Sequence, residues 1–555
     1  MKKNIIIITI LVLIALGLRV LYIDCPLWYD EACSWMSASQ NNFSSILKNL
    51  FTLDLQHTPF YFFLLHIWIN IFGQTEFAMR TLSLLFALGT IPLVYLTAKR
   101  LSNHTTPSVF AALICAVSPL LVLFSAEIRM YSAVTFLVML SVYFLVKFEQ
   151  TADKKTLLYL TLTNISIPYF YTGGILYNLS VLLGYCVYLK KKKSDKLNNY
   201  LKFAKIEWIC LIPYFIFIGY YAKIRSAFIV SHEGYLRLFH ITDIIRNFFG
   251  AIIDNNIYWV SDGTISITIF TLVLTIIPCI YFITGICKSL KSENPFIKTL
   301  TDIFILNFCF AVFVSALQVN ILTVRYVIYL LPAFIILSVF GLYKNLNSKH
   351  FKIFIILFLF FATAFSIKNS RIIKNNKTLA LKDAAIECET LGLGSDDAVI
   401  MPFASDSPYY FRSVMQPFVA NFDFHKVARN PYGVYYDKSQ RKELKKDKSK
   451  FVYEKIKENN VMSQTFANYF AQNVTFKAAK GRYAAVIMYG TDNNAIEPIE
   501  ELRKEVKDLK YADKNLLDVL FKKYMCDIIA MLNNDFKFIQ MYKKNNFTYY
   551  IYQKI

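Results

Sequence analysis

Long runs of apolar residues alternate with short polar segments through the first two thirds of the chain. Most runs approach the length that an α-helix needs to cross the ~30 Å hydrocarbon core of a bilayer. The pattern predicts a polytopic α-helical membrane protein with eleven transmembrane helices, within one or two. The predicted spans are 5–22, 78–98, 107–124, 131–147, 157–171, 175–189, 206–221, 265–286, 302–317, 326–342 and 351–367.

Lysines and arginines follow every second apolar run, and two lysines precede the first. Cytoplasmic loops carry such an excess of basic residues, so the N-terminus is expected inside. The other loops are then expected on the outer face. They are 23–77, 125–130, 172–174, 222–264 and 318–325.

The composition narrows the class of protein and its partners. With 56% hydrophobic residues, the chain does not have the composition of a soluble enzyme. The net charge of +22 lies largely in the basic loops and the C-terminal third, so we expect contact with membrane lipid and no nucleic-acid partner. No small-residue cleavage pattern follows the first run, which we interpret as a retained transmembrane helix.

The composition of the sequence changes near residue 370, where Asn, Asp, Lys and Glu become frequent. Strand-like runs at 398–401 and 484–488 alternate with a polar helical pattern at 498–510. We therefore predict a transmembrane domain over 1–369 and an extracytoplasmic soluble α/β domain over 370–555. The Lys-rich segment 437–450 is interpreted as a solvated face or loop.

Cysteine spacing does not predict a metal site. The ten cysteines lack the CxxC spacing of metal centres, and no compact metal-ligand cluster is evident. Cys25 with Cys33, or Cys388 with Cys526, could form disulfides in an oxidising compartment, but spacing alone does not decide this.

Ionisable residues gather in the loops that are expected outside. Such groups at membrane depth usually face a cavity and mark function. Alone, each has a structural explanation: an arginine can anchor a helix at the interface, an acid can cap one, and Glu127 with Arg129 can pair across a turn. Together they suit a cavity that holds an anion and moves a proton. The charged candidates are Asp30, Glu31, His57, Arg80, Glu127, Arg129 and Arg325, with Tyr29, Tyr131 and Tyr326 beside them.

Two further segments of the outer face carry expectations. The apolar, aromatic stretch 57–73 starts with Pro59 near a helical first turn and is interpreted as a helix lying at the membrane surface. Loop 222–264 is either a lid over the donor or an ordinary surface loop. Its polar residues include His232, Glu233, Tyr235, Arg237, His240 and Asp254.

Five motifs in this order resemble those of the GT-C class of polyprenyl-phosphate-dependent glycosyltransferases. The pattern is similar to bacterial relatives of the protein O-mannosyltransferases and of the enzyme that adds aminoarabinose to lipid A, and it covers roughly residues 1–345. The motifs are Asp30-Glu31, His57-x-Pro59, Phe77-x-x-Arg80, Glu127-x-Arg129-x-Tyr131 and Arg325-Tyr326.

The resemblance implies an inverting transfer of a sugar from a polyprenyl phosphate to an acceptor on the outer face of the plasma (inner) membrane. By family position, Asp30 is the catalytic carboxylate and Glu31 orients substrate. Arg325, with Arg80, Arg129 and Tyr326, binds the donor phosphate. No cofactor is required in this interpretation, although the carboxylates and His57 leave a bound divalent cation open.

Two rival functions remain open on sequence grounds. A flippase or transporter for a lipid-linked sugar would also have many spans, but it would place polar residues within reach of both faces. A catalytically silent relative would use its C-terminal domain to bind a partner. The sequence does not separate a glycan, lipid or protein acceptor, nor does it identify the sugar.

Overall fold

The computed structural model describes only part of the 555-residue chain, and all structural statements below refer to that part. The chain divides into two compact units, and each is described by itself. The first comprises Met1–Cys25, Ser37–Ala222 and Leu236–Asn375, and the second comprises Pro26–Met36, Lys223–Tyr235 and Asn376–Ile555. The described residues are 2–23, 25, 27, 29–53, 57–228, 269–316, 324–342, 349–374, 386–387, 390, 397–400, 483–489, 536–544 and 547–555.

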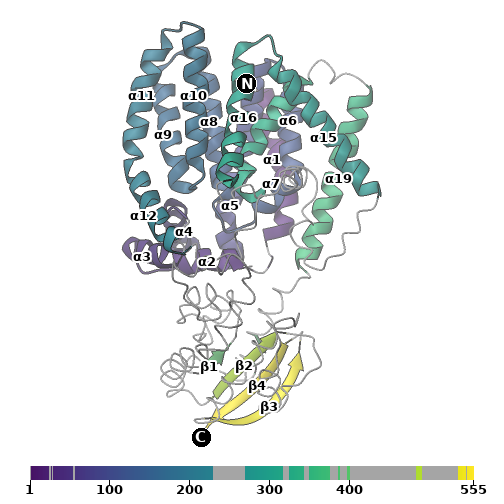
Figure 1. The fold of residues 1–555 in the computed structure, drawn as a ribbon. Helices are drawn as coiled ribbons and strands as arrows, with labels where there is room; N and C mark the ends of the chain where they lie inside the picture. The colour runs from purple at the N-terminus through teal and green to yellow at the C-terminus, as the bar shows by residue number, and fades with distance from the viewer. Residues whose placement is uncertain are drawn as a thin grey trace, which may run out of the picture. The chain divides into compact units, whose positions relative to one another are not determined.

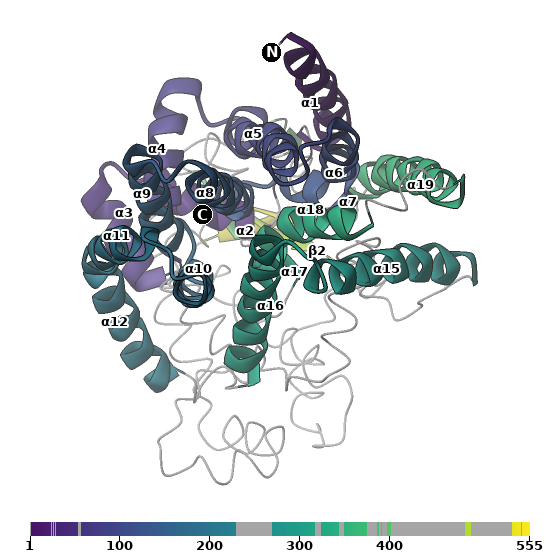
Figure 2. The same ribbon diagram turned by 90° about the horizontal axis from the view of Figure 1, so that it is seen from above.

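The first unit is built of helices (Figures 1 and 2). Every predicted span falls on helical backbone in the described residues, and the stretch predicted at 57–73 forms the shorter helix α4. The helices are α1 (Lys2–Ile23), α3 (Phe43–Leu53), α4 (Phe60–Phe72), α5 (Glu76–Ser102), α6 (Thr105–Val117), α7 (Pro119–Phe124), α8 (Tyr131–Thr151), α9 (Lys154–Phe170), α10 (Gly174–Lys191), α11 (Lys196–Cys210), α12 (Ile212–Phe228), α15 (Ile269–Leu290), α16 (Pro295–Ala316), α17 (Val324–Val327), α18 (Leu331–Gly341) and α19 (Lys349–Lys374).

Four of these helices are long and apolar enough to cross a membrane within the described residues: α1, α5, α8 and α16. Other apolar helices do not meet both criteria within the described residues, and three of the predicted spans are interrupted. The chain is a membrane protein by this helical content, while the count of eleven spans stays a prediction.

The interruptions have local causes where the structure describes them. Between α6 and α7, Ser118 leaves the helical region at φ −54° and ψ 118°, and Pro119 lacks the backbone N–H that a continuous helix would need. A break at Leu211 separates α11 from α12, and a short 3-10 turn, Ile328–Leu330, separates α17 from α18. Apolar periodicity continues across all three breaks, so the sequence predicted unbroken helices there.

Helix packing sets the framework of the first unit. Helix α5 packs on α1, α6 and α8, while α8, α9, α10 and α11 lie beside one another (Figures 1 and 2). Helices α15 and α18 approach so closely that a Cβ atom on Gly341 would overlap the carbonyl of Gly285. Small residues allow this approach between apolar helices.

A buried polar network joins α8, α9, α10 and α11. Asn164 and Asn178 each donate an amide N–H to the carboxylate of Glu207, both at 3.1 Å. The Oδ1 atom of Asn164 accepts from Ser141 at 2.6 Å, and Ser141 accepts from Tyr177 at 2.8 Å. Glu207 is 4% exposed, so these bonds replace the water that a carboxyl group would otherwise need.

Polar contacts also tie the ends of α8 to α9 and α10. Glu149 accepts from Tyr185 and Tyr188 and forms an ion pair with Lys192 at 2.9 Å. Next to it, Asp153 caps α9, and bonds from the Thr156 hydroxyl and nearby backbone N–H groups hold the pKa of its carboxyl below the usual range.

The second unit contains a four-stranded mixed sheet in the order β1-β2-β4-β3. Strand β1 (Ala398–Ile400) runs parallel to β2 (Tyr483–Tyr489), and β4 (Phe547–Lys554) is antiparallel to both β2 and β3 (Phe536–Lys544). The strands predicted at 398–401 and 484–488 are confirmed, whereas the hairpin of β3 and β4 was not predicted. The segments 229–268, 437–450 and 498–510, which include the possible lid and the predicted polar helix, lie outside the described residues.

Candidate functional site

Helix α2 (Tyr29–Ala38) carries the predicted catalytic acids in its first turn. Glu31 is buried at 1% exposure, Asp30 is half-buried, and the Ser34 hydroxyl donates to the Asp30 carbonyl at 3.0 Å. Acids suit this end of a helix, where unpaired N–H groups give a positive potential. Residues Pro26–Met36 belong to the second unit, so the meeting of these acids with the arginines of the first unit stays a prediction.

Arg80 lies one turn into α5 and is buried at 2% exposure. Its Nη1 atom donates to the carbonyls of Ile23, at 3.2 Å, and of Cys25. Ile23 ends α1 and Cys25 follows it, so no further helical N–H is present to pair these carbonyls. Arg80 therefore holds the carboxyl end of α1 against the amino end of α5, and its predicted contact with a donor phosphate stays a prediction.

Arg129 and His57 form the central contact of the site. The Arg129 Nη2 atom lies 2.9 Å from His57 Nε2, and the two residues are 4% and 5% exposed. A guanidinium can only donate, so His57 Nε2 must accept and the ring proton must sit on Nδ1. This bond orients the His57 ring, and Pro59 is the N-cap of α4, with no side-chain cap bond.

Arg129 also lies in the short turn between α7 and α8 that carries Glu127. The Arg129 backbone N–H donates to the Glu127 carbonyl at 2.8 Å, and the Glu127 side chain is buried at 5% exposure. Ser83 on α5 contacts both the Arg129 carbonyl and the Tyr61 hydroxyl, each at 3.4 Å. Helices α4 and α5 and the turn before α8 therefore meet at His57 and Arg129.

Tyr131, Arg325 and Tyr326 form an adjoining aromatic group. The Arg325 guanidinium lies 5.0 Å from the Tyr326 ring centroid, and its Nη2 atom donates to the Tyr326 hydroxyl at 3.3 Å. The Tyr131 and Tyr326 rings are 6.3 Å apart, and Tyr171 donates to the Tyr326 carbonyl at 3.0 Å. Because Tyr131 follows Arg129 by two residues, this group adjoins the His57–Arg129 contact.

Most of the residues proposed for the site belong to the first unit. They lie in or next to the terminal turns of helices and are His57, Arg80, Glu127, Arg129, Tyr131, Arg325 and Tyr326. Tyr29 begins α2, with Asp30 and Glu31 behind it. Cys25 and Cys33 are both thiols, and Cys388 and Cys526 lie outside the described residues.

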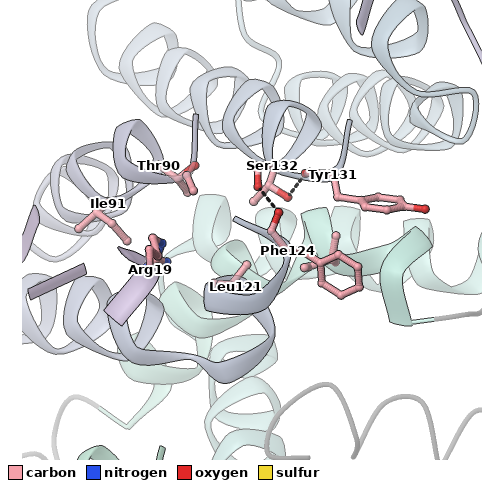
Figure 3. A pocket seen from close by; sticks show the side chains of 10 residues that line it. Arg19, Thr90, Ile91, Leu121, Phe124, Tyr131 and Ser132 are labelled. Atoms are coloured by element: carbon pink, nitrogen blue, oxygen red, sulfur yellow. Dashed lines mark hydrogen bonds between the residues drawn. The ribbon is translucent and has the colours of Figure 1, made fainter. Parts of the chain in front are cut away.

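A small pocket next to this group contains a residue that the sequence interpretation missed (Figure 3). Arg19 of α1 is its charged member, and about 10 Å³ is open, room for about one water molecule. Its only sequence signal is a lone arginine near the end of a long apolar run. The lining residues are Arg19, Ala87, Thr90, Ile91, Leu121, Phe124, Tyr131, Ser132, Thr135 and Ile328.

The chemistry of the first unit's site is that of anion recognition. Three guanidiniums, an imidazole and tyrosine hydroxyls supply donors, and the planar guanidinium matches phosphate oxygens. Within the described part of the chain, no group of three or more His, Cys, Asp and Glu residues is placed to hold a metal ion. The expectation that no cofactor is required stays a prediction.

One protein-family model matches part of the chain. Residues 56–217 match the family model described as dolichyl-phosphate-mannose-protein mannosyltransferase. This range includes His57, Arg80, Glu127, Arg129 and Tyr131. No curated protein sequence matches the chain significantly.

Solved structures extend the similarity over nearly the full length. ArnT from Cupriavidus metallidurans bound to undecaprenyl phosphate is similar with a TM-score of 0.51 and 12% identity, covering 98% of this chain and 97% of that one. Its apo state gives a TM-score of 0.50 over the same shares. The oligosaccharyltransferase of Archaeoglobus fulgidus, tethered to an acceptor peptide, gives 0.50 at 12% identity, covering 99% of this chain and 74% of that one.

At 12% identity the structural similarity concerns the fold alone. The family model adds similarity in sequence over residues 56–217, which carry five of the site candidates. Together with the apolar helices, these findings describe a membrane protein with a fold similar to that of ArnT and with a segment, residues 56–217, similar to the dolichyl-phosphate-mannose-protein mannosyltransferase family.

Proposed function

We propose that the protein transfers a sugar from a polyprenyl-phosphate donor to an acceptor hydroxyl on the outer face of the plasma (inner) membrane, with inversion at the anomeric carbon. The observation that carries the proposal is the buried contact between His57 and Arg129, with Arg80 buried on α5 and with Arg325 against Tyr326, whose ring lies 6.3 Å from that of Tyr131. Such a concentration of guanidinium groups among apolar helices suits a lipid-linked phosphate, whose charge must be neutralised near the membrane.

The proposed reaction is a single displacement. The acceptor oxygen forms a bond to the anomeric carbon while the bond from that carbon to the phosphate oxygen breaks. The electron pair of the broken bond stays on the lipid phosphate, and the acceptor proton passes to the Asp30 carboxylate. One carboxylate on the face opposite the leaving group gives inversion without a covalent glycosyl-enzyme.

The arginines would stabilise the charge that grows on the departing phosphate. Arg325 is our first candidate for direct contact, because it is less buried than Arg80 and Arg129. Arg80 and Arg129 would add positive potential, and Tyr326 would orient the Arg325 guanidinium. Glu31 would orient substrate, and Tyr29, His57, Glu127 and Tyr131 would line the cavity.

Two neighbours support the partner classes. The ArnT structure contains undecaprenyl phosphate, and the oligosaccharyltransferase structure contains a tethered acceptor peptide. For this chain we propose a polyprenyl-phosphate sugar as donor, with a glycan, lipid or protein as acceptor. The second unit would lie on the same outer face.

The test follows radiolabel from a polyprenyl-phosphate sugar into membrane acceptors. Membranes with the wild type, Asp30→Asn or Asp153→Asn are incubated with the donor, and the lipid, glycan and protein fractions are counted separately. Asp153→Asn is the matched control, because it makes the same chemical change at a helix cap, where asparagine also serves. We expect Asp30→Asn to lose about 10²–10⁴-fold in transfer rate.

Equal transfer by wild type and Asp30→Asn would remove Asp30 from the mechanism. If the labelled sugar lipid crosses sealed vesicles while no fraction gains label, the flippase function is correct instead.

A further inference from the structure

Arg19 is a buried charge in one of the most apolar segments of the chain. It lies near the carboxyl end of α1 and is 1% exposed. A guanidinium stays protonated under ordinary conditions, and burial of a charge without partners is very costly. Its bonding partners therefore indicate why the position carries an arginine.

The Arg19 guanidinium bonds to the end of another helix. Its Nη1 atom donates to the Ala15 carbonyl of its own helix at 3.0 Å and to the Ala116 carbonyl at 2.7 Å. Ala116 is the last residue but one of α6, which ends where Ser118 leaves the helical conformation before Pro119. The last carbonyls of a helix lack intrahelical partners and carry a partial negative charge. Arg19 is thus a cationic cap on the carboxyl end of α6.

The segment that follows this cap leads directly into the candidate site. Helix α7 is six residues long and entirely buried, and its last residue, Phe124, accepts a hydrogen bond at its carbonyl from the Ser132 hydroxyl at 2.8 Å. The next residues form the turn with Glu127 and Arg129, and Arg129 bonds to His57. Residues 117–130 are therefore held at one end by Arg19 and at the other by Ser132 and His57.

The pocket places these contacts close together. Arg19 from α1, Phe124 from α7 and Tyr131 and Ser132 from α8 line the same small cavity (Figure 3). A shift of the α6 end would therefore be transmitted through a short, closely packed segment to the turn that carries Arg129.

We infer that Arg19 is a positioning residue, which fixes the break between α6 and α7 and thereby sets the place of Glu127 and Arg129 in the site. This inference rests on the proposed glycosyl transfer for its kinetic consequence, but its structural consequence can be measured without any activity. A misplacement of about 1 Å in a catalytic group can cost about 100-fold in rate.

The experiment compares full-length Arg19→Met, Arg19→Lys and Arg100→Met with wild type. Methionine keeps much of the side-chain volume and removes the charge, whereas lysine retains a cation. Arg100 is the matched control: it bonds to Gln150 at 2.9 Å and lies over Tyr143, joining α5 to α8 away from residues 117–130. Each purified protein is checked for a single monodisperse species.

Two readouts are taken from the same preparations. Hydrogen–deuterium exchange of peptides that cover residues 117–130 reports the order of the segment, and transfer kinetics report kcat and the KM for the donor. For Arg19→Met we expect faster exchange in 117–130 and a fall of about 100-fold in kcat, with a smaller change in KM. Arg19→Lys should keep kcat within about tenfold of wild type, because it retains a cation at the helix end. Arg100→Met should leave the exchange of residues 117–130 and the transfer kinetics unchanged.

Unchanged exchange in 117–130 for folded Arg19→Met would overturn the inference, whatever happens to the rate. If Arg19→Met does not fold, Arg19→Lys provides the test. Exchange in 117–130 equal to that of wild type, with kcat within tenfold of wild type, supports the inference. A loss of kcat without altered exchange contradicts it. If wild type itself transfers no sugar, the proposed function fails while the exchange measurement still tests the positioning role.

Discussion

The contact between Arg129 and His57 makes a quantitative prediction about the site. The perturbation is a double-mutant cycle with Arg129→Met, His57→Phe and the double variant, which remove the donor, the acceptor or both. In wild type the two nitrogen atoms are 2.9 Å apart and both side chains are almost fully buried. A buried hydrogen bond with one charged partner contributes about 1.5–3 kcal/mol.

The rate consequence follows from that range. If the bond holds both groups in their working positions, each single variant loses about 10- to 150-fold in kcat/KM. The double variant should lose little more than the worse single variant, because both changes break the same bond. His57→Gln should lose less than His57→Phe, since its amide oxygen can accept from Arg129.

The assay is transfer of label from a polyprenyl-phosphate sugar by purified protein at several donor concentrations. Ser83→Ala is a matched control, because it removes only the 3.4 Å contact to the Arg129 carbonyl and the 3.4 Å contact to Tyr61. It should fall within about threefold of wild type, as expected for weak bonds. Losses that simply add in the double variant would show that Arg129 and His57 act separately, and would refute the reasoning.

Two further predictions concern the framework of the first unit. Gly341→Ala should lower the thermal stability of the detergent-solubilised protein by about 1–3 kcal/mol, because its Cβ would overlap the Gly285 carbonyl. Gly17→Ala meets nothing within 4 Å and is the control; equal melting of the two variants would contradict the close approach of α15 and α18. Glu207→Leu should destabilise by about 1–3 kcal/mol for each of the two asparagine N–H groups that lose the carboxylate as acceptor, and Glu207→Gln by less, as measured by thermal melting. A leucine variant that melts above wild type would show that burial of the carboxyl group costs more than its bonds return.

The positions of the helices could be predicted from the sequence because apolar runs of this length have few alternatives. Their interruptions could not be, since hydropathy stays high through Ser118-Pro119 and Leu211 while the backbone leaves the helix. The hairpin of β3 and β4 also escaped prediction. Its tyrosines and lysines give no strict alternation of apolar and polar residues.

For the candidate site, the sequence could predict candidate residues but not their contacts. The motifs named candidate residues whose roles stay predictions, and four of them, His57, Arg80, Arg129 and Arg325, belong to the first unit. What each guanidinium bonds to could not be predicted: Arg80 pairs with the end of α1, and Arg129 pairs with His57. A helix end presents its carbonyls only after folding, so a sequence motif cannot distinguish an arginine that caps a helix from one that binds a phosphate.

The buried carboxyl group of Glu207 has a consequence for how α11 is held in the membrane. Helix α11 also carries Lys202 and Lys205 and is too polar to enter lipid alone, because charged residues are disfavoured at the centre of a bilayer. Its carboxyl group is matched only by amides on α9 and α10. Both α9 and α10 precede α11 along the chain. We therefore expect α11 to be stable in the membrane only when it is packed against α9 and α10, whose asparagines pair with Glu207.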